Sequence, residues 1–317
     1  TGFNSERKNW AYRQDQLSST HPIVSDMIDI ETVNANFDGI TYAKGASVLQ
    51  QLVAHVGRDN FITGLQKYFA KHAFANTTLD DLLVELTATS GRDLKPWVST
   101  WLQTAGVNTL RPKLEISDDK YSKIEIMQEA PLVPAGSKEL RPHRLAVGLY
   151  DVKGDDVVLR KSVELDVAGS STTVTELAGE KVADLLLIND RDLSYAKVRL
   201  DERSIATLKS HLGNISDGLT RAMCWAISWD MLRDAEISAT DFIEIALAGL
   251  PGESDITVVT VIGNQLTTAV ELYANPANRD ALRIKVADGI ANLLASAKAS
   301  GRAETVSRRS ARAFTAG

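Results

Sequence analysis

The chain has 317 residues, of which 44% are hydrophobic and 24% charged, and its formal net charge is -6 at pH 7. This length predicts about two or three domains, and the acidic balance without a basic stripe argues against a nucleic acid or an anionic membrane as a partner. No apolar run is long enough to cross a bilayer. The single cysteine, Cys224, excludes an intrachain disulfide framework and a cysteine-rich metal site, and the absence of disulfides favours a cytoplasmic location.

The first part of the chain, from residue 1 to about 36, is expected to be irregular with some short helix. Residues 42–106 show helical periodicity in four segments. Thr41 is the expected cap of the first helix, and Gly57 is expected to end it. Its apolar residues recur at steps of four and three, which predicts one buried face made of Tyr42, Ala46, Leu49, Val53 and Val56.

The next three helices are predicted from caps and spacing. Asp59 is placed to cap the second helix. Thr78 and Asp81 form a capping-box-like pair at the start of the third. Trp97 and Trp101 lie four residues apart, and therefore on one face of the fourth helix.

From Val107 to about Asn189 the hydrophobic period changes to two, and turn residues separate the runs. Short strands without intervening helices are typical of a small β-sandwich. The alternation predicts strands at residues 114–116, 123–126, 145–149, 157–159, 163–167 and 185–188.

Helical periodicity returns near Asp201, and consecutive helices with short connections favour an array of α-hairpins. The helices are predicted at residues 202–213, 216–234, 239–249, 254–274 and 277–299. Cys224 falls in an apolar helical run and is expected to be a buried structural thiol. The predicted fold class is therefore α+β with three domains, at residues 1–106, 107–190 and 191–317.

Residues 37–49 have the sequence Phe-Asp-Gly-Ile-Thr-Tyr-Ala-Lys-Gly-Ala-Ser-Val-Leu. This string resembles the segment of the aminopeptidase N family of zinc metallopeptidases, of the gluzincin type, that carries the catalytic tyrosine in a Tyr-x-Lys-Gly motif. Strings at residues 10–23, 97–108, 189–201 and 225–234 resemble further segments of that family in the expected order. The resemblance implies the helical end of a thermolysin-like catalytic domain, then a small β-sandwich, then a helical C-terminal domain.

Tyr42 is the candidate catalytic residue. The resemblance implies that its phenolic hydroxyl donates to the oxygen of the scissile carbonyl while a zinc-bound water attacks. A developing oxyanion needs a preorganised donor, a neutral phenol is a good donor, and the start of a helix favours negative charge. The alternative is that Tyr42 packs on the core, since it shares the phase of the apolar stripe.

Phe37 is the candidate substrate-binding residue. It precedes Tyr42 by five residues, and related enzymes often place an aromatic residue near this position, where it can line a substrate pocket. Ordinary packing is the alternative for Phe37. Lys44 and Gly45 belong to the motif, but neither needs a chemical role.

The metal site of the family is not found in this sequence. The family binds zinc with a His-Glu-x-x-His helix and a later Glu, but no two histidines of this chain are four residues apart. The five histidines are His21, His55, His72, His143 and His211. The chain is therefore expected to hold no metal itself, and zinc is expected in the full-length parent protein.

We interpret the chain as the C-terminal fragment of a zinc aminopeptidase that hydrolyses N-terminal residues from peptides, and we expect the fragment alone to be inactive. Its expected partners are peptide substrates and the missing N-terminal part of the same protein, and not a nucleic acid or a membrane. The alternative is a non-catalytic interaction module, in which a β-sandwich and helical repeats offer a concave surface to another protein.

Overall fold

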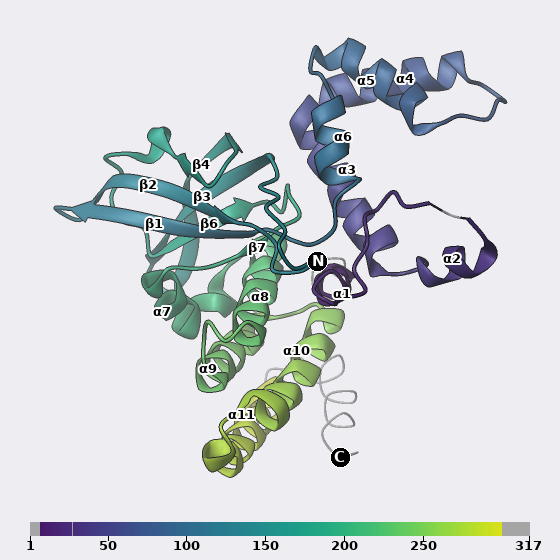
Figure 1. The fold of residues 1–317 in the computed structure, drawn as a ribbon. Helices are drawn as coiled ribbons and strands as arrows, with labels where there is room; N and C mark the ends of the chain where they lie inside the picture. Colours follow the sequence, from purple (N-terminus) through teal and green to yellow (C-terminus); the bar gives the residue numbers. More distant parts are fainter. Residues whose placement is uncertain (1–6, 27, 300–317) are drawn as a thin grey trace.

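The structure, a computed structural model, describes residues 7–26 and 28–299 (Figure 1). Its first part is helical, as predicted. Thr78 and Asp81 form the expected capping box of α5, and Gly91 follows that helix in the left-handed conformation, with φ of 69°. The helices of this part are α1 (Lys8–Gln14), α2 (Ile30–Ala35), α3 (Gly45–Val56), α4 (Arg58–Lys71), α5 (Leu79–Ser90) and α6 (Lys95–Trp101).

A single residue, Gly57, joins α3 to α4. Its φ of 86° would strain any other residue, so the predicted end of α3 at this glycine is confirmed. Asp59 is not the cap of the next helix, because α4 already begins at Arg58 and Asp59 lies inside its first turn. An acidic residue in that position still favours the helix through the positive end of its dipole.

The start of α3 differs from the prediction. A π-helical turn, η2 (Ile40–Lys44), precedes α3; Gly39 is its N-cap residue, and the side chain of Asp38 rather than that of Thr41 accepts from its first N–H groups. The Asp38 Oδ1 accepts from the backbone N–H groups of Ile40 (2.9 Å) and Thr41 (3.0 Å). The Thr41 hydroxyl instead donates to the carbonyl of Asn36.

The predicted buried face of this helix is also wrong. Only Val56 of the predicted stripe is buried, whereas Tyr42, Ala46 and Leu49 are exposed. Hydrophobic periodicity does not identify the face that is buried, because three residues of that face, Lys44, Ser47 and Gln51, are polar. The buried residues are Ala43, Lys44, Ser47, Val48, Gln51, Leu52 and Val56.

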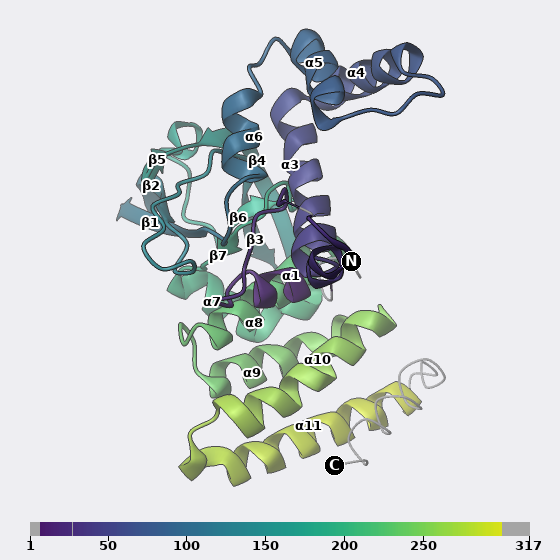
Figure 2. The ribbon, with the colours of Figure 1, turned by 45° about the vertical axis from the view of Figure 1, so that its right-hand side comes forward.

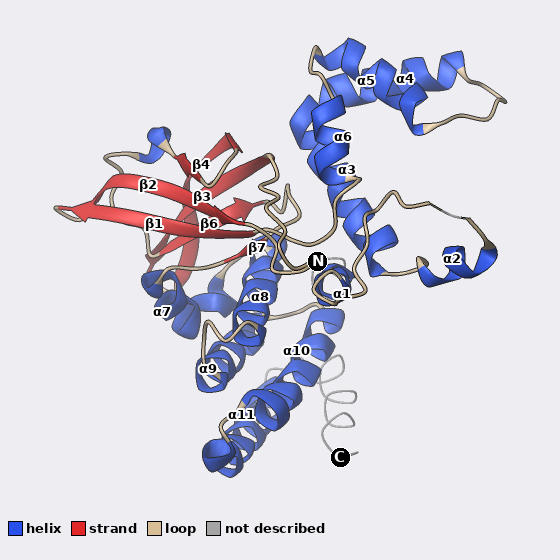
Figure 3. Ribbon diagram, viewed as in Figure 1, coloured by secondary structure: helices blue, strands red, loops and turns tan. Residues whose placement is uncertain are grey.

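Two small sheets follow α6 and are drawn red in Figure 3. The four-stranded sheet has the order β5-β2-β1-β7, and only its β1–β7 pair is parallel. Its strands are β1 (Thr109–Ser117), β2 (Lys120–Glu129), β5 (Ser171–Thr173) and β7 (Lys197–Val198). The three-stranded sheet has the order β4-β3-β6, all antiparallel, with β3 (His143–Lys153), β4 (Asp156–Val167) and β6 (Leu185–Asp190).

Each predicted strand lies within one of these strands, with two differences. The predicted strands at 157–159 and 163–167 are one continuous strand, β4. The short strands β5 and β7 were not predicted, and β7 lies beyond residue 190. Buried side chains of both sheets, such as Leu110, Ile126 and Val147, belong to one hydrophobic cluster.

The C-terminal helices begin at capping side chains. Asp201, Asp217, Ser238 and Asp255 each accept a hydrogen bond from the backbone of the helix that follows. The helices are α7 (Glu202–His211), α8 (Gly218–Arg233), α9 (Ala239–Gly249), α10 (Ile256–Thr268) and α11 (Arg279–Ala299), and α10 and α11 lie side by side in Figures 1 and 2. Cys224 is buried in α8, as expected. Within the described residues, no helix combines the length and the apolar character needed to cross a membrane.

The fold class is α+β, and its hydrophobic core has two parts. One cluster runs from the sheets into the C-terminal helices, from Leu110 to Val286. The other lies among α1, α3, α5 and α6 and includes Val107 and Tyr195. Apolar packing thus does not stop at residue 190, and the division into domains at 1–106, 107–190 and 191–317 stays a prediction, whose part beyond residue 299 lies outside the described residues.

A buried ion pair connects these parts of the chain. The side chains of Asp15 and Lys44 are both 0% exposed, and the Lys44 Nζ lies 2.8 Å from the Asp15 Oδ2. Asp15 also accepts from the Tyr195 hydroxyl (3.2 Å), the Gly106 N–H (2.9 Å) and the Thr20 hydroxyl (2.6 Å). Burial lowers the pKa of Lys44 to about 8, against the attraction of Asp15. Lys44, which needs no chemical role in the motif, is therefore a structural anchor.

We expect Lys44→Met to lower the free energy of unfolding by about 3–5 kcal/mol, because it leaves the Asp15 carboxylate buried without its cation. Lys71→Met is the matched control, since Lys71 pairs with Glu85 at 3.1 Å but is 59% exposed. Its loss should cost less than about 1 kcal/mol. Urea unfolding of the two variants and the wild type measures both values, and equal losses would contradict the assigned role of Lys44.

Candidate functional site

Tyr42 lies in the middle of the π turn that precedes α3. The turn is closed by a hydrogen bond from the Gly45 N–H to the carbonyl of Ile40. Single π turns of this kind are frequent at functional sites. The residue is 49% exposed, so the alternative that Tyr42 packs in the core is wrong.

The ring of Tyr42 lines a cavity of about 390 Å³ together with Arg7, Trp10, Phe37 and Ala43. Phe37 meets Tyr42 edge to face, with ring centroids 4.8 Å apart and planes at 68°, a favourable geometry for two aromatic rings. The two candidate site residues are thus neighbours, and Phe37 is even more exposed than Tyr42. Exposed aromatic side chains gathered around a cavity are typical of a binding surface.

The Tyr42 hydroxyl is available to a ligand. Among residues 7–26 and 28–299, no hydrogen bond to it is found. A phenol can donate one hydrogen bond and accept others. The site therefore offers a neutral donor at the edge of an aromatic pocket.

The close contact between the π turn and α1 explains the glycine of the Phe-Asp-Gly string. The Gly39 N–H donates to the Gln14 Oε1 at 3.0 Å. A Cβ on Gly39 would lie 3.0 Å from the Trp10 Cδ2 and 3.2 Å from the backbone of Ala11. Any larger residue would push the turn away from α1 and from the pocket that Trp10 helps to form.

The described residues do not fit a zinc site. Within residues 7–26 and 28–299, no group of three or more His, Cys, Asp or Glu side chains could hold a metal ion. The Nδ1 of His55 lies 3.2 Å from the Arg92 guanidinium, and His72 packs against the ring of Tyr68. A zinc site needs three or four converging donors, and none of these histidines supplies such a set.

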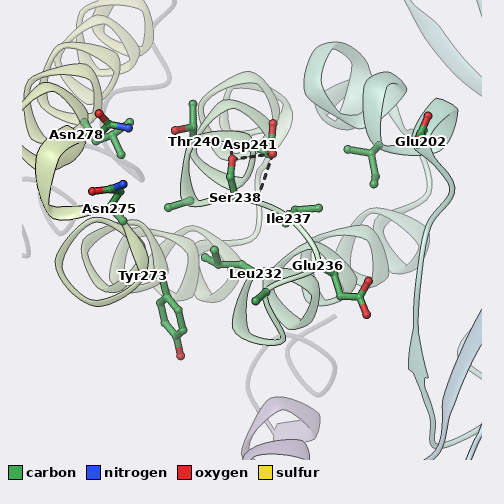
Figure 4. Close-up of a pocket in the computed structure, with 15 residues that line it drawn as sticks. Glu202, Leu232, Glu236, Ile237, Ser238, Thr240, Asp241, Tyr273, Asn275 and Asn278 are labelled. Atoms are coloured by element: carbon green, nitrogen blue, oxygen red, sulfur yellow. Dashed lines mark hydrogen bonds between the residues drawn. The ribbon is translucent and has the colours of Figure 1, made fainter.

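A larger cavity, about 660 Å³, lies among the C-terminal helices (Figure 4). Tyr273 and Asn278 line it from the connection between α10 and α11, and the turn between α8 and α9 lines it from the other direction. Ser238 and Asp241 are engaged there in the capping box of α9, and the Glu236 carboxylate pairs with the Arg111 guanidinium. These polar groups serve the fold, and neither candidate site residue lies at this cavity.

Known protein families match both ends of the chain. The Peptidase family M1 domain matches residues 2–101, which include the π turn and its pocket, and the ERAP1-like C-terminal domain matches residues 185–316. Aminopeptidase N of Streptomyces lividans is 53% identical over 287 residues, which are 89% of this chain and 34% of that protein. The chain belongs to the aminopeptidase N family of M1 peptidases. The family predicted from the Tyr-x-Lys-Gly string is thus confirmed.

Less similar relatives match parts of the chain. Tricorn protease-interacting factor F2 of Thermoplasma volcanium is 26% identical over 271 residues, which are 84% of this chain and 31% of that protein. Leucyl aminopeptidase of Saccharolobus solfataricus is 28% identical over 163 residues, which are 49% of this chain and 20% of that protein. The chain therefore spans about a third or less of the length of these relatives.

Sequence patterns single out Tyr42 and Phe37 in this M1 segment, but not the residues that support them. Trp10 lies in a string that resembles the family, yet only the structure places it at the pocket. Asp38 lies in the string around the motif, but an aspartate is common in turns, so the sequence does not indicate that its side chain supports the site. His21 lies 17 residues before Asp38, and no local spacing connects the two.

His143 is a buried core residue at the start of β3. Its Nδ1 lies 2.7 Å from the Ser194 Oγ and its Nε2 lies 2.8 Å from the Gln128 Oε1. Burial, and then the charge of Arg141, lower the pKa of His143 to about 3. The ring is therefore neutral at pH 7 and supports the packing of the sheets.

We expect His143 to make the fold sensitive to acid. Its pKa of about 3 in the folded protein lies below the usual 6.5, so the unfolded chain binds more protons between these values and stability falls as the pH is lowered from about 6.5 towards 3. The loss should reach about 3 kcal/mol near pH 4. Unfolding free energies of the wild type and of His143→Gln between about pH 7 and pH 4 measure it, and the advantage of the wild type should shrink with falling pH. A difference that stays constant with pH would count against this assignment.

Proposed function

We propose that this chain supplies part of the active site of an M1 aminopeptidase that hydrolyses N-terminal residues from peptides. Tyr42 donates its hydroxyl to the oxygen of the scissile carbonyl as that carbon becomes tetrahedral. The observation that carries the proposal is the presentation of Tyr42. Its hydroxyl is unengaged within the described residues, on a fixed π turn at the edge of an aromatic pocket, inside the segment that matches the M1 domain.

Phe37 and Trp10 are proposed to contact the substrate. Both side chains line the cavity beside Tyr42 and are exposed. Aromatic walls bury apolar parts of a ligand without a large loss of side-chain entropy. Such walls hold the peptide while the Tyr42 hydroxyl reaches its carbonyl oxygen.

The zinc that the family implies has no fitting site among the described residues. We propose that the metal and a general base come from a part of the parent protein that precedes this chain. The exposed apolar side chains of Ala46 and Leu49, which follow Tyr42 along the helix, are the surface that this part would cover. A cytoplasmic location stays a prediction that rests on the single cysteine.

In the parent enzyme, Tyr42→Phe should lower kcat by about 10²–10³-fold, the usual cost of one oxyanion donor. KM should change little, because the hydroxyl acts on the tetrahedral intermediate rather than on the bound substrate. Tyr273→Phe is the matched control, since Tyr273 is a similarly exposed tyrosine (40%) at the cavity among the C-terminal helices. Steady-state kinetics of both variants test the role, and a Tyr42→Phe enzyme within about threefold of wild type would remove Tyr42 from the mechanism.

The isolated chain should bind no stoichiometric zinc and hydrolyse no aminoacyl substrate. The reason is the lack of three converging donors within residues 7–26 and 28–299. Elemental analysis of the purified, tag-free chain, together with an assay on a chromogenic aminoacyl substrate, measures both properties. One tightly held zinc ion per chain would overturn this expectation.

A further inference from the structure

A histidine–carboxylate pair adjoins the site, and the proposed chemistry does not use it. The His21 Nε2 lies 2.8 Å from the Asp38 Oδ2, and the His21 Nδ1 lies 2.8 Å from the carbonyl oxygen of Pro22. Their side chains are only 16% and 8% exposed. Two contacts on opposite sides of the imidazole fix the plane of the ring.

The other carboxylate oxygen of Asp38 holds the π turn. Its Oδ1 accepts from the N–H groups of Ile40 and Thr41, at 2.9 and 3.0 Å. The Tyr42 N–H donates to the backbone carbonyl of Asp38 at 3.1 Å. The orientation of Asp38 therefore sets where the turn begins, and with it the position of Tyr42.

The opposite side of the turn is fixed by α1 through Gln14 and Gly39. The segment between α1 and α2 therefore contacts the turn in two places, through the ion pair of Asp15 with Lys44 and through the contact of His21 with Asp38. His21 belongs to that segment and orients the carboxylate from outside the turn.

We propose that His21 is a positioning residue for Tyr42, which acts by orienting the Asp38 carboxylate that caps the π turn. This inference rests on the proposed function of Tyr42. His21 is not among the residues that line the cavity, so we expect its effect on the reaction to be transmitted through Asp38 and the backbone of the turn. Small errors in the placement of a reacting group lower turnover without preventing binding.

The test is a double-mutant cycle in the parent enzyme, with His21→Ala, Tyr42→Phe and the double variant. His21→Ala alone should lower kcat about tenfold with KM nearly unchanged. In the Tyr42→Phe background it should lower kcat by no more than about twofold, because the hydroxyl that it positions is already gone. Independent losses that multiply in the double variant would overturn the proposal.

Two further variants separate positioning from general damage. His21→Gln keeps a donor near the position of Nε2 and should recover most of the lost kcat. His211→Ala, a histidine of α7 that contacts Ser210, should leave kcat unchanged. If His21→Ala does not fold, the same cycle is run with Asp38→Asn, which keeps an acceptor for the backbone N–H groups but not the carboxylate for His21. Failure of His21→Gln to restore kcat would contradict the role of the Asp38 contact.

Hydrogen exchange tests the effect of His21 on the π turn without an activity assay. The amides of Ile40 and Thr41 should exchange about tenfold faster in His21→Ala than in wild type, while amides of α5 should be unaffected. If the Tyr42→Phe enzyme retains activity but the amides of Ile40 and Thr41 lose protection in His21→Ala, the proposed function fails and the structural effect of His21 stands. If Tyr42→Phe is impaired and the amides keep their protection, the inference about His21 fails alone.

Discussion

The fold depends on the burial of one carboxylate, that of Asp15. A buried ion without a partner costs several kcal/mol, so this arrangement is stable only when donors from separate parts of the chain converge on it. The donors are Lys44 from the π turn, Thr20 after α1, Gly106 after α6 and Tyr195 between β6 and β7. These contacts connect the helical first part of the chain to residues at the ends of the sheet strands.

The same contact explains the spacing of the Tyr-x-Lys motif. Residues two apart in a helical turn project to nearly opposite sides. Because Lys44 is held inward at Asp15, Tyr42 must project outward, where its ring meets Phe37 at the cavity. The lysine anchors the turn and the tyrosine is presented by it. The Gly45 of the motif has no such steric reason among the described residues, since a Cβ there would meet only the Ile40 carbonyl oxygen at 3.9 Å.

Local patterns predicted most helices and strands because their signals are local. The capping box of Thr78 and Asp81 and the alternation in the strands need no information from distant residues. The buried face of the π turn and α3 was mispredicted because three of its residues, Lys44, Ser47 and Gln51, are polar, and the partner of Lys44 lies 29 residues earlier in the chain. The candidate site shows the same division: the motif singles out Tyr42 as a candidate, whereas His21, the partner of Asp38, lies 17 residues earlier and is not indicated by any periodicity.

The buried ion pair and the exposed aromatic pair each lower the stability of the chain in a different way. Burial removes the hydration of the charged side chains of Asp15 and Lys44, a cost that an apolar pair would not have. Tyr42 and Phe37 expose apolar surface to water, and burying that surface would contribute about 25 cal/mol per Å². Neither choice maximises the stability of the chain. Both fit the role proposed for Tyr42, because a group that contacts a ligand needs exposure and its support needs fixed geometry. Substitutions in the support should therefore change where Tyr42 sits, and substitutions in the aromatic wall should change what binds beside it.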